Sequence, residues 1–251
     1  MLQRLIASRL ITPPAIWGKL PGHADFVRSG MRHGESEGWQ PWLAQQGRLD
    51  AAGRSTPAGT ALPAAFVLPP GTLGFARRRF VVGVITPSMD KVGRQHALLV
   101  YQLAHPRWIR RHFDPQALQP HDWLFWLARA VARHTGPQGI ADIKALERTV
   151  LALWRLHAPS VGQLWGRTGG AVKLDSAEAR GQAAQDLLDR LGGFEPADDP
   201  AAQLHGVRFF PWADWPQRLF KARGEGTFWQ QDAAGGYVNA AARLPMLWGG
   251  A

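Results

Sequence analysis

The sequence predicts an α/β fold of the α+β kind: a three-layer αβα sandwich with helices on both faces of one central, mostly antiparallel or mixed sheet. Two neighbouring aliphatic runs, 81–85 and 97–103, have the length and composition of strands buried on both faces. Three segments between residues 121 and 191 carry apolar residues at helical spacing. Strand-like runs return after residue 206, so strands flank the helices on both sides in the chain.

The N-terminal half supplies most of the expected strands, which are Ala15–Trp17, Ala64–Leu68, Phe80–Thr86 and Ala97–Leu103. Thr86-Pro87 is expected to end the third strand, because proline donates no hydrogen bond to a sheet. Ser88–Arg94 then predicts a shaped turn in which Gly93 takes a positive φ. The aliphatic pattern places four side chains in the core, namely Val82, Val84, Leu98 and Val100.

Helices are expected between these strands and the C-terminal region. The first covers Glu37–Gly47, with Pro41 in its first turn. The longer ones cover His121–His134, Ile140–His157, and the stretch from Asp175/Ser176 to Leu191.

The C-terminal region predicts a strand at Val207–Trp212, one or two helical turns at Trp215–Phe220, and a closing hairpin over 226–244. Leu49–Leu62 and Phe194–His205 are expected to be loops. We expect an N-terminal extension at 1–14 and a single domain at 15–251. That domain comprises a motif-bearing core at 15–135, a helical part at 136–205 and closing strands at 206–251.

The composition limits the classes of function. The 251 residues include no cysteine, which excludes disulfides, thiolate metal sites and cysteine nucleophiles and fits a reducing compartment. No apolar run reaches the roughly 18 residues of a membrane-spanning helix. The net charge is +10, and arginines cluster in two places: Arg77, Arg78 and Arg79, then Arg107, Arg110 and Arg111. We expect these clusters to contact an acidic protein surface; nucleic acid is the alternative.

The residues with catalytic potential do not form a recognisable active site. Ser88, Asp90 and His96 are the types used in a nucleophile triad, but no Gly-x-Ser-x-Gly elbow is present. His105, His112 and Asp114 are the best metal candidates, yet they are too few to predict a zinc site. We therefore expect no enzymatic activity, no metal and no cofactor.

Twelve tryptophans are present, and most fall on expected helix faces or strand ends. Trp212, Trp215 and Trp248 lie outside this pattern. Because tryptophan is a frequent anchor of protein interfaces, these positions predict a contact surface near the C-terminal end.

Two polar motifs follow strand-like runs. The first is Gly18-Lys19-Leu20-Pro21 with Asp25-Phe26-Val27 shortly after it, and the second is Pro87-Ser88-Met89-Asp90-Lys91-Val92-Gly93-Arg94. Together, in this order and spacing, they resemble the TagF (ImpM) family of type VI secretion accessory proteins. The resemblance is good over residues 16–103 and weaker over 209–244. Ala24 replaces the family's usual glycine, and Gln95-His96 replaces its usual aromatic residues.

The resemblance implies a cytoplasmic, post-translational repressor of type VI secretion. It would bind and sequester the scaffold protein that carries a forkhead-associated (FHA) domain. The motif side chains Lys19, Asp25, Ser88, Asp90 and Arg94 would either contact that partner or brace the two loops against each other, for example through an Asp25–Arg94 ion pair. An unrecognised hydrolase and a protein that binds nucleic acid or another anionic surface remain the alternatives.

Overall fold

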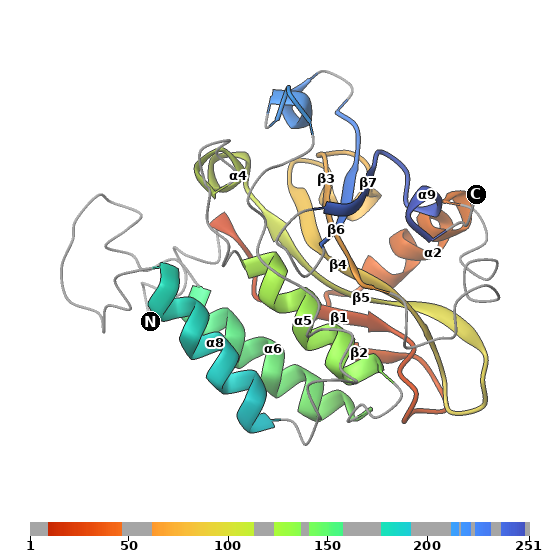
Figure 1. Ribbon diagram of the computed structural model, residues 1–251. Helices are drawn as coiled ribbons and strands as arrows, with labels where there is room; N and C mark the ends of the chain where they lie inside the picture. Colours follow the sequence, from red (N-terminus) through yellow and green to blue (C-terminus); the bar gives the residue numbers. More distant parts are fainter. Residues whose placement is uncertain are drawn as a thin grey trace.

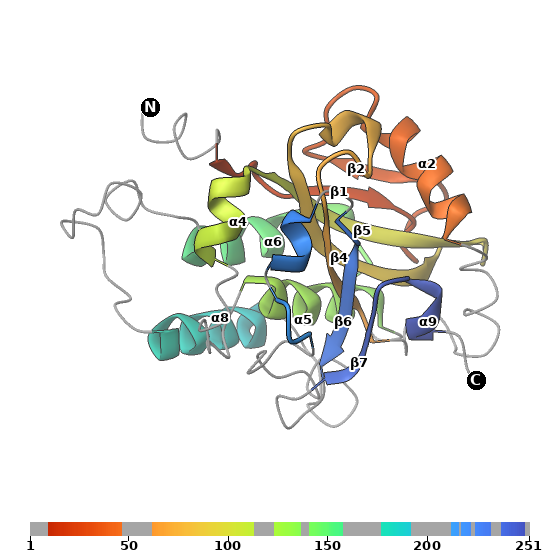
Figure 2. The same ribbon diagram turned by 90° about the horizontal axis from the view of Figure 1, so that it is seen from above.

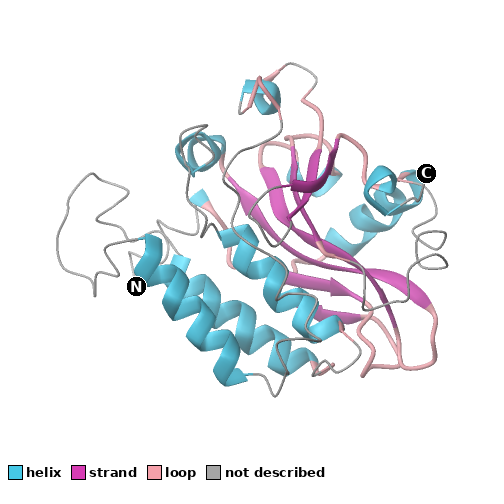
Figure 3. Cartoon of the chain, viewed as in Figure 1, coloured by secondary structure: helices cyan, strands magenta, loops and turns pink. Residues whose placement is uncertain are grey.

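The structure is a computed structural model of the chain, and it describes residues 10–46, 62–112, 123–136, 141–157, 177–191, 212–215, 217–221, 224–231 and 237–248 (Figure 3). The loops expected at Leu49–Leu62 and Phe194–His205 lie almost wholly outside these ranges, as do all residues but the last of the strand expected at Val207–Trp212.

A seven-stranded antiparallel sheet forms the centre of the described fold (Figure 1). Its strands in spatial order are β2 (Val27–Ser29), β1 (Ala15–Gly18), β5 (Gln95–Ala104), β4 (Phe80–Met89), β3 (Ala64–Leu68), β6 (Thr227–Gln231) and β7 (Tyr237–Ala241). The strands predicted at Ala15–Trp17, Ala64–Leu68, Phe80–Thr86 and Ala97–Leu103 therefore lie in one sheet, with the β4–β5 hairpin at its centre and the closing hairpin β6–β7 at one edge. The expected α+β fold with one central, mostly antiparallel or mixed sheet is confirmed.

Both faces of the central strands are buried, as their aliphatic sequence predicts. Val82, Val84, Leu98 and Val100 are each 0% exposed and belong to the core on one face. The alternate residues Val81, Ile85 and Leu99 point to the core on the other face. Side chains alternate between the two faces of a strand, so a run without polar residues fills two cores at once.

Helices complete the outer layers (Figures 1 and 2). The first core contains side chains of α5 (Trp123–Thr135), α6 (Ile143–His157) and α8 (Ala177–Leu191), in which α5 packs on β4, α6 on α5, and α8 on α6. The second core contains side chains of α2 (Glu35–Gln45) and Leu247 of α9 (Pro245–Trp248). The three-layer sandwich is thus confirmed.

Two proline positions differ from expectation. Pro41 lies inside α2 and not in its first turn, because the helix begins at Glu35. Thr86-Pro87 does not end β4, which continues to Met89 and pairs Pro87 with Ala97. The last β4 residue that pairs with β3 is Ile85, so among the described strands none pairs with this side of β4 at Pro87, and prolines are tolerated at such an edge.

Four short elements were not expected from the sequence: β2, α4 (Pro106–His112), α9 and the 3₁₀ turn η1 (Gly74–Ala76). The 3₁₀ turn η3 (Gln217–Phe220) falls in the stretch expected to be helical. Residues 10–12 lie along the end of β5: Ile11 bridges to Ala104, and Thr12 Oγ1 accepts a hydrogen bond from the Leu103 N–H at 2.9 Å.

Candidate functional site

The two sequence motifs form two loops that lie against each other. The motif loop, residues 19–26, joins β1 to β2, and the motif turn, Asp90–Arg94, joins β4 to β5. Gly18 ends β1 with a φ of 136°. A Cβ atom there would lie 2.1 Å from the carbonyl oxygen of Ala97 on β5, so only glycine lets β1 pair this closely and then turn into the loop. The predicted proximity of the two motifs is therefore confirmed.

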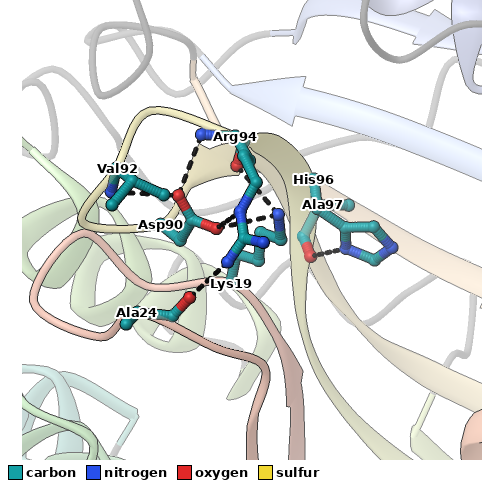
Figure 4. A network of polar contacts seen from close by, with 7 residues as sticks. All are labelled: Lys19, Ala24, Asp90, Val92, Arg94, His96 and Ala97. Carbon is teal, nitrogen blue, oxygen red and sulfur yellow. Dashed lines mark hydrogen bonds and ion pairs between the residues drawn. The ribbon is translucent and has the colours of Figure 1, made fainter.

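A buried carboxylate holds the loops together (Figure 4). Asp90 Oδ2 lies 2.9 Å from Lys19 Nζ and 2.7 Å from Arg94 Nε. Its other oxygen, Oδ1, accepts hydrogen bonds from the backbone N–H groups of Val92 and Arg94 at 3.1 and 2.8 Å. Asp90 therefore shapes its own turn and binds the opposite loop with the same side chain.

Arg94 connects the loops a second time. Its Nη2 donates to the carbonyl oxygen of Ala24 at 2.6 Å (Figure 4), and its own carbonyl oxygen accepts from Lys19 Nζ at 3.2 Å. The Asp25–Arg94 ion pair offered as an example of bracing is not the one that forms, because Asp90 is nearer along the turn and its carboxylate occupies Nε of the guanidinium. Gly93 takes the predicted positive φ, 85°.

The charge state of Asp90 follows from these contacts. Burial by itself would raise the pKa of the carboxyl group. Hydrogen bonds from Lys19, from both the backbone and side chain of Arg94, and from the Val92 N–H outweigh burial and hold the pKa well below its usual range. Asp90 is thus ionised at neutral pH, and the buried Lys19 ammonium has a counter-charge.

His23 fastens the motif loop to the helical layer. Its carbonyl oxygen accepts from the Lys91 N–H at 2.8 Å, and its Nε2 accepts from the Ile143 N–H at 3.1 Å. Ile143 is the first residue of α6, so the imidazole satisfies one of the free N–H groups at that helix end. The motif turn, the motif loop and α6 are therefore linked in series.

An aromatic cluster closes the site on the sheet side. The Phe26 ring stacks on Trp17 with centroids 5.6 Å apart, and His96 packs edge-on against both rings. Lys19 Nζ lies 5.5 Å from the Phe26 ring centroid, in a cation–π contact. His96 thus belongs to the packing beside the network, and its Nδ1 lies 2.7 Å from the Ala97 carbonyl oxygen.

Some residues of the two motifs are buried, and others are accessible to solvent. Lys19, Ser88 and Asp90 are buried, as are Leu20 and Pro87. Accessible residues of the two motifs are Asp25, Lys91, Val92, Gly93 and Arg94, with Pro21 and Phe26 half-buried. The Val92 side chain is 67% exposed. Among the described residues, the exposed large hydrophobic ones are Val92 and Met246. The internal network thus holds a rigid turn that presents Val92 to solvent.

The contacts of the triad candidates are structural. The Asp90 carboxylate is engaged by Lys19 and Arg94, while Ser88 Oγ is buried and has no hydrogen-bond partner in the described part of the chain. His105 Nδ1 accepts from the Arg107 N–H at 3.1 Å; the side chain of His112, and Asp114, are not described. Within the described ranges, no three His, Asp or Glu side chains are grouped to hold a metal ion.

The two arginine clusters lie far from the motif turn. Arg77–Arg79 precede β4 and Arg107 follows β5, whereas the motif turn joins the other ends of the same two strands. Arg77, Arg78, Arg107 and Arg110 are exposed, and Arg79 is half-buried; the Arg111 side chain is not described.

The expectation of a tryptophan contact surface near the C-terminal end is wrong for Trp215. Trp215 is 3% exposed and belongs to the first core, where its ring lies edge-on to Trp229, so it is not a surface anchor. Trp212 is half-buried and stacks on Trp215, with the Arg218 guanidinium 4.9 Å from its ring centroid. The reason is that Leu219 of η3 and Trp229 of β6 lie in the same core cluster as Trp215. The Trp248 side chain lies outside the described residues.

Two sets of structural contacts are not evident from the sequence, one made by His23 and one made by Tyr101 with Glu35. His23 was not singled out, although it lies within the first motif. Tyr101 and Glu35 form a buried pair on the other face, with Tyr101 Oη donating to Glu35 Oε2 at 2.7 Å. Burial, and then the Glu35 carboxylate, raise the pKa of Tyr101 far above its usual range. A lone tyrosine in an aliphatic strand was the available signal for a buried polar partner.

In structural class this is an α+β sandwich whose two motif loops are locked by a buried ion network. The family model described as TagF N-terminal domain, type VI secretion system-associated, matches residues 15–153. That is more than half of the chain, which therefore belongs to the TagF family of type VI secretion-associated proteins.

Among solved structures, PA0076 from Pseudomonas aeruginosa PAO1 is similar over 92% of this chain and 89% of that chain, with 20% identity and a TM-score of 0.46. No curated protein matches the sequence significantly. Among the described helices, none is both long and apolar enough to cross a bilayer.

Proposed function

We propose that this TagF-family protein is a non-enzymatic, cytoplasmic repressor of type VI secretion that binds and sequesters the FHA-domain scaffold protein. The main observation in support of this proposal is the family match over residues 15–153, a range that contains both motifs and the ion network that joins them. A further support is that the charged groups of Lys19, Asp90 and Arg94 make internal contacts, which suits a preorganised binding loop better than a reactive site. The absence of cysteine from the sequence fits a cytoplasmic location.

The motif turn is the proposed contact. A turn with fixed geometry loses little conformational entropy on binding, so preorganisation adds to affinity. Val92 supplies an apolar anchor, and Lys91 and Arg94 are exposed beside it. Two N–H groups of Arg94 bond to Asp90 and Ala24, which fixes the plane of its guanidinium while leaving donors for a carboxylate of the partner.

Repression follows from mass action. A repressor that binds the scaffold lowers the concentration of free scaffold. The reduction grows with the ratio of the free repressor concentration to the dissociation constant. The function therefore needs no turnover, only affinity at cellular concentrations and enough copies of the repressor.

Calorimetry with the purified scaffold, together with a secretion assay in cells that overproduce this protein, tests the proposal. We expect a one-to-one complex and reduced secretion. Absence of binding at tens of micromolar, together with unchanged secretion, would show that the proposal is wrong. A scaffold lacking its FHA domain is the control that locates the contact on the partner.

A further inference from the structure

The two arginine clusters are brought to one end of the sheet by the register of β4 and β5. Phe80 pairs with Ala104, so Arg79 immediately precedes one member of this pair and His105 immediately follows the other. Arg79 Nη1 donates to the Leu103 carbonyl oxygen at 3.3 Å, which ties the first cluster to β5. The two segments that carry the arginine clusters thus meet at one end of the sheet.

Like charges crowd this end of the sheet. Burial, and then the charge of Arg32, lower the pKa of Arg79. Burial also lowers the pKa of His105, followed by the charges of Arg107 and Arg79. Cationic residues of three separate segments therefore lie close enough to influence one another. They are Arg32 before α2, Arg79 before β4, and Arg107 in α4.

Three acidic side chains of the described ranges, in α2 and around η3, are engaged in other contacts. Glu35 is buried and accepts hydrogen bonds from Tyr101 Oη and the Arg32 backbone N–H. Across η3, Asp214 pairs with Lys221 and Arg218, and Glu225 pairs with Arg218. Like charges gathered at one place on a surface repel one another, and an external anion relieves that repulsion.

We propose that the arginine surface, defined as Arg32, Arg77, Arg78, Arg79 and Arg107, is a docking site for a carboxylate-rich segment of the protein partner. This rests on the proposed function, whose partner it describes more closely. Guanidinium groups pair with carboxylates through two parallel hydrogen bonds, which lysine cannot do, and each of the five cations is arginine.

Two other anionic partners fit less well. Membrane binding by a basic surface is strengthened by apolar side chains that insert, but Val92 and Met246, the exposed large hydrophobic residues of the described chain, are not members of the arginine surface. Single-stranded nucleic acid favours exposed aromatic platforms, whereas Phe80 and Trp108, next to the arginines, are buried.

The arginine surface is separate from the motif turn. The ten residues of β4 lie between them, which corresponds to about 30 Å at about 3.3 Å per residue. This exceeds a Debye length of about 8 Å at physiological salt, so the two surfaces are electrostatically independent. A partner that reaches both would bind through an apolar contact at one end of the hairpin and a charged contact at the other.

A charge-matched pair of double variants tests the inference. Arg77→Glu with Arg78→Glu alters the arginine surface, and Arg148→Glu with Arg155→Glu alters exposed positions on α6. Each pair changes the net charge from +10 by −4 to +6, so any effect of overall charge is shared. All four side chains are exposed, and thermal melts check that both variants fold. Arg107→Glu alone is the second variant of the arginine surface.

Stopped-flow association with the scaffold is measured at low and at moderate salt. We expect the Arg77/Arg78 variant to associate at least about 10-fold more slowly at low salt, with a shallower salt dependence and little change in dissociation rate. The α6 variant should stay within about 2-fold of the unaltered protein. Equal slowing of both double variants, or of neither, would overturn the inference.

A second arm separates this inference from the proposed function. A fluorescent poly-glutamate peptide of 20 residues replaces the scaffold, with duplex DNA and phosphatidylserine vesicles as competing probes. If the scaffold does not bind but the peptide binds the unaltered protein and not the Arg77/Arg78 variant, the arginine surface stands and the proposed partner falls. Tighter binding of DNA or vesicles than of peptide, lost in the same variant, would refute the assignment to an acidic protein segment.

Discussion

Lys19 Nζ and Asp90 Oδ2 lie 2.9 Å apart, with the Lys19 side chain 9% and the Asp90 side chain 0% exposed. Burial removes hydration from both charges, so neither can lose its partner without leaving an isolated buried charge. The pair is satisfied further by backbone N–H groups on Asp90 and by the Arg94 carbonyl oxygen on Lys19. The position of the end of β1 relative to the β4–β5 turn is therefore fixed by electrostatic contacts as well as by strand pairing.

The first prediction concerns pH. The folded-state pKa of Asp90 is lowered from 3.8, so its stabilising contribution is fully present above about pH 4 and is lost as pH falls through the folded-state pKa. Asp90→Asn should lower the thermal midpoint by several degrees at pH 7. This difference should shrink steadily below about pH 4, because the Asp90 carboxyl group then binds a proton in the unfolded state while it is still ionised in the folded state.

Thermal unfolding at pH 7, 4 and 3 measures this difference. Asp189→Asn is the control, because Asp189 also has a lowered pKa, through Gln185 and Arg133 against the opposing effect of burial, but is 55% exposed. Exposed ion pairs contribute at most about 1 kcal/mol, so the control should change little at any pH. A constant difference between Asp90→Asn and the unaltered protein from pH 7 to 3 would disprove the network's role.

The second prediction concerns the first motif glycine. Gly18→Ala should destabilise the protein by about 2–5 kcal/mol, because it combines a strained φ with a clash against the Ala97 carbonyl oxygen. Gly74→Ala is the matched control, since a Cβ atom there meets nothing within 4 Å. Denaturant midpoints measure both, and similar values for the two variants would contradict the close approach of β1 to β5.

The third prediction concerns the tip of the motif turn. Val92→Asp should leave stability within about 0.5 kcal/mol of the unaltered protein, because the side chain is 67% exposed. It should weaken scaffold binding at least about 10-fold, which corresponds to about 1.4 kcal/mol. Met246→Asp, at a residue 64% exposed on α9, is the control. Calorimetry that finds equal affinity for both variants would remove Val92 from the interface.

The fourth prediction distinguishes a core tryptophan from a surface one. Trp215→Ala should destabilise the protein by about 3–5 kcal/mol, because its buried ring packs in the first core against Trp229. Trp212→Ala should cost clearly less, since Trp212 is half-buried. Thermal denaturation compares the two. If Trp215→Ala leaves stability intact and weakens only scaffold binding, Trp215 is an interface residue after all.

The fifth prediction concerns the extent of the folded unit. A fragment of residues 15–153, the range matched by the family model, lacks β6 and β7 and so leaves β3 with an unpaired edge. All five residues of β3 are buried in the full chain. We expect this fragment to aggregate or to unfold at a clearly lower temperature than the full chain. A monomeric fragment with an unchanged midpoint, by light scattering and calorimetry, would show that the closing hairpin is dispensable.

The sequence predicts the sheet well where a strand is almost wholly apolar. Ala64–Leu68 and Ala97–Leu103 are recognisable because a strand buried on both faces carries few polar residues, here only Gln102, and few other structures produce so short and apolar a run. The extension of β4 through Pro87 is harder to predict, since it depends on β3 having ended beside it. Neighbouring strands decide that outcome, not the local sequence.

The candidate site follows a similar rule. Sequence places the two motifs in adjacent loops, and the structure confirms that adjacency. The choice of ion pair depends on angles and distances that no spacing reveals: Arg94 bonds to Asp90 within its own turn, so Asp25 is left exposed. Trp215 shows the converse, because a tryptophan in an irregular segment has no periodicity from which to read its burial.

The strand order also constrains how the chain is made. On one side β3 pairs with β4, which follows it closely, but on the other side it pairs with β6, whose residues begin at Thr227. A ribosome adding about 5–20 residues per second needs on the order of ten seconds or more to travel from Leu68 to that point. During this interval the emerging chain carries a hydrophobic strand with one open edge. Association with a chaperone at this stage of translation would protect it until the last hairpin arrives.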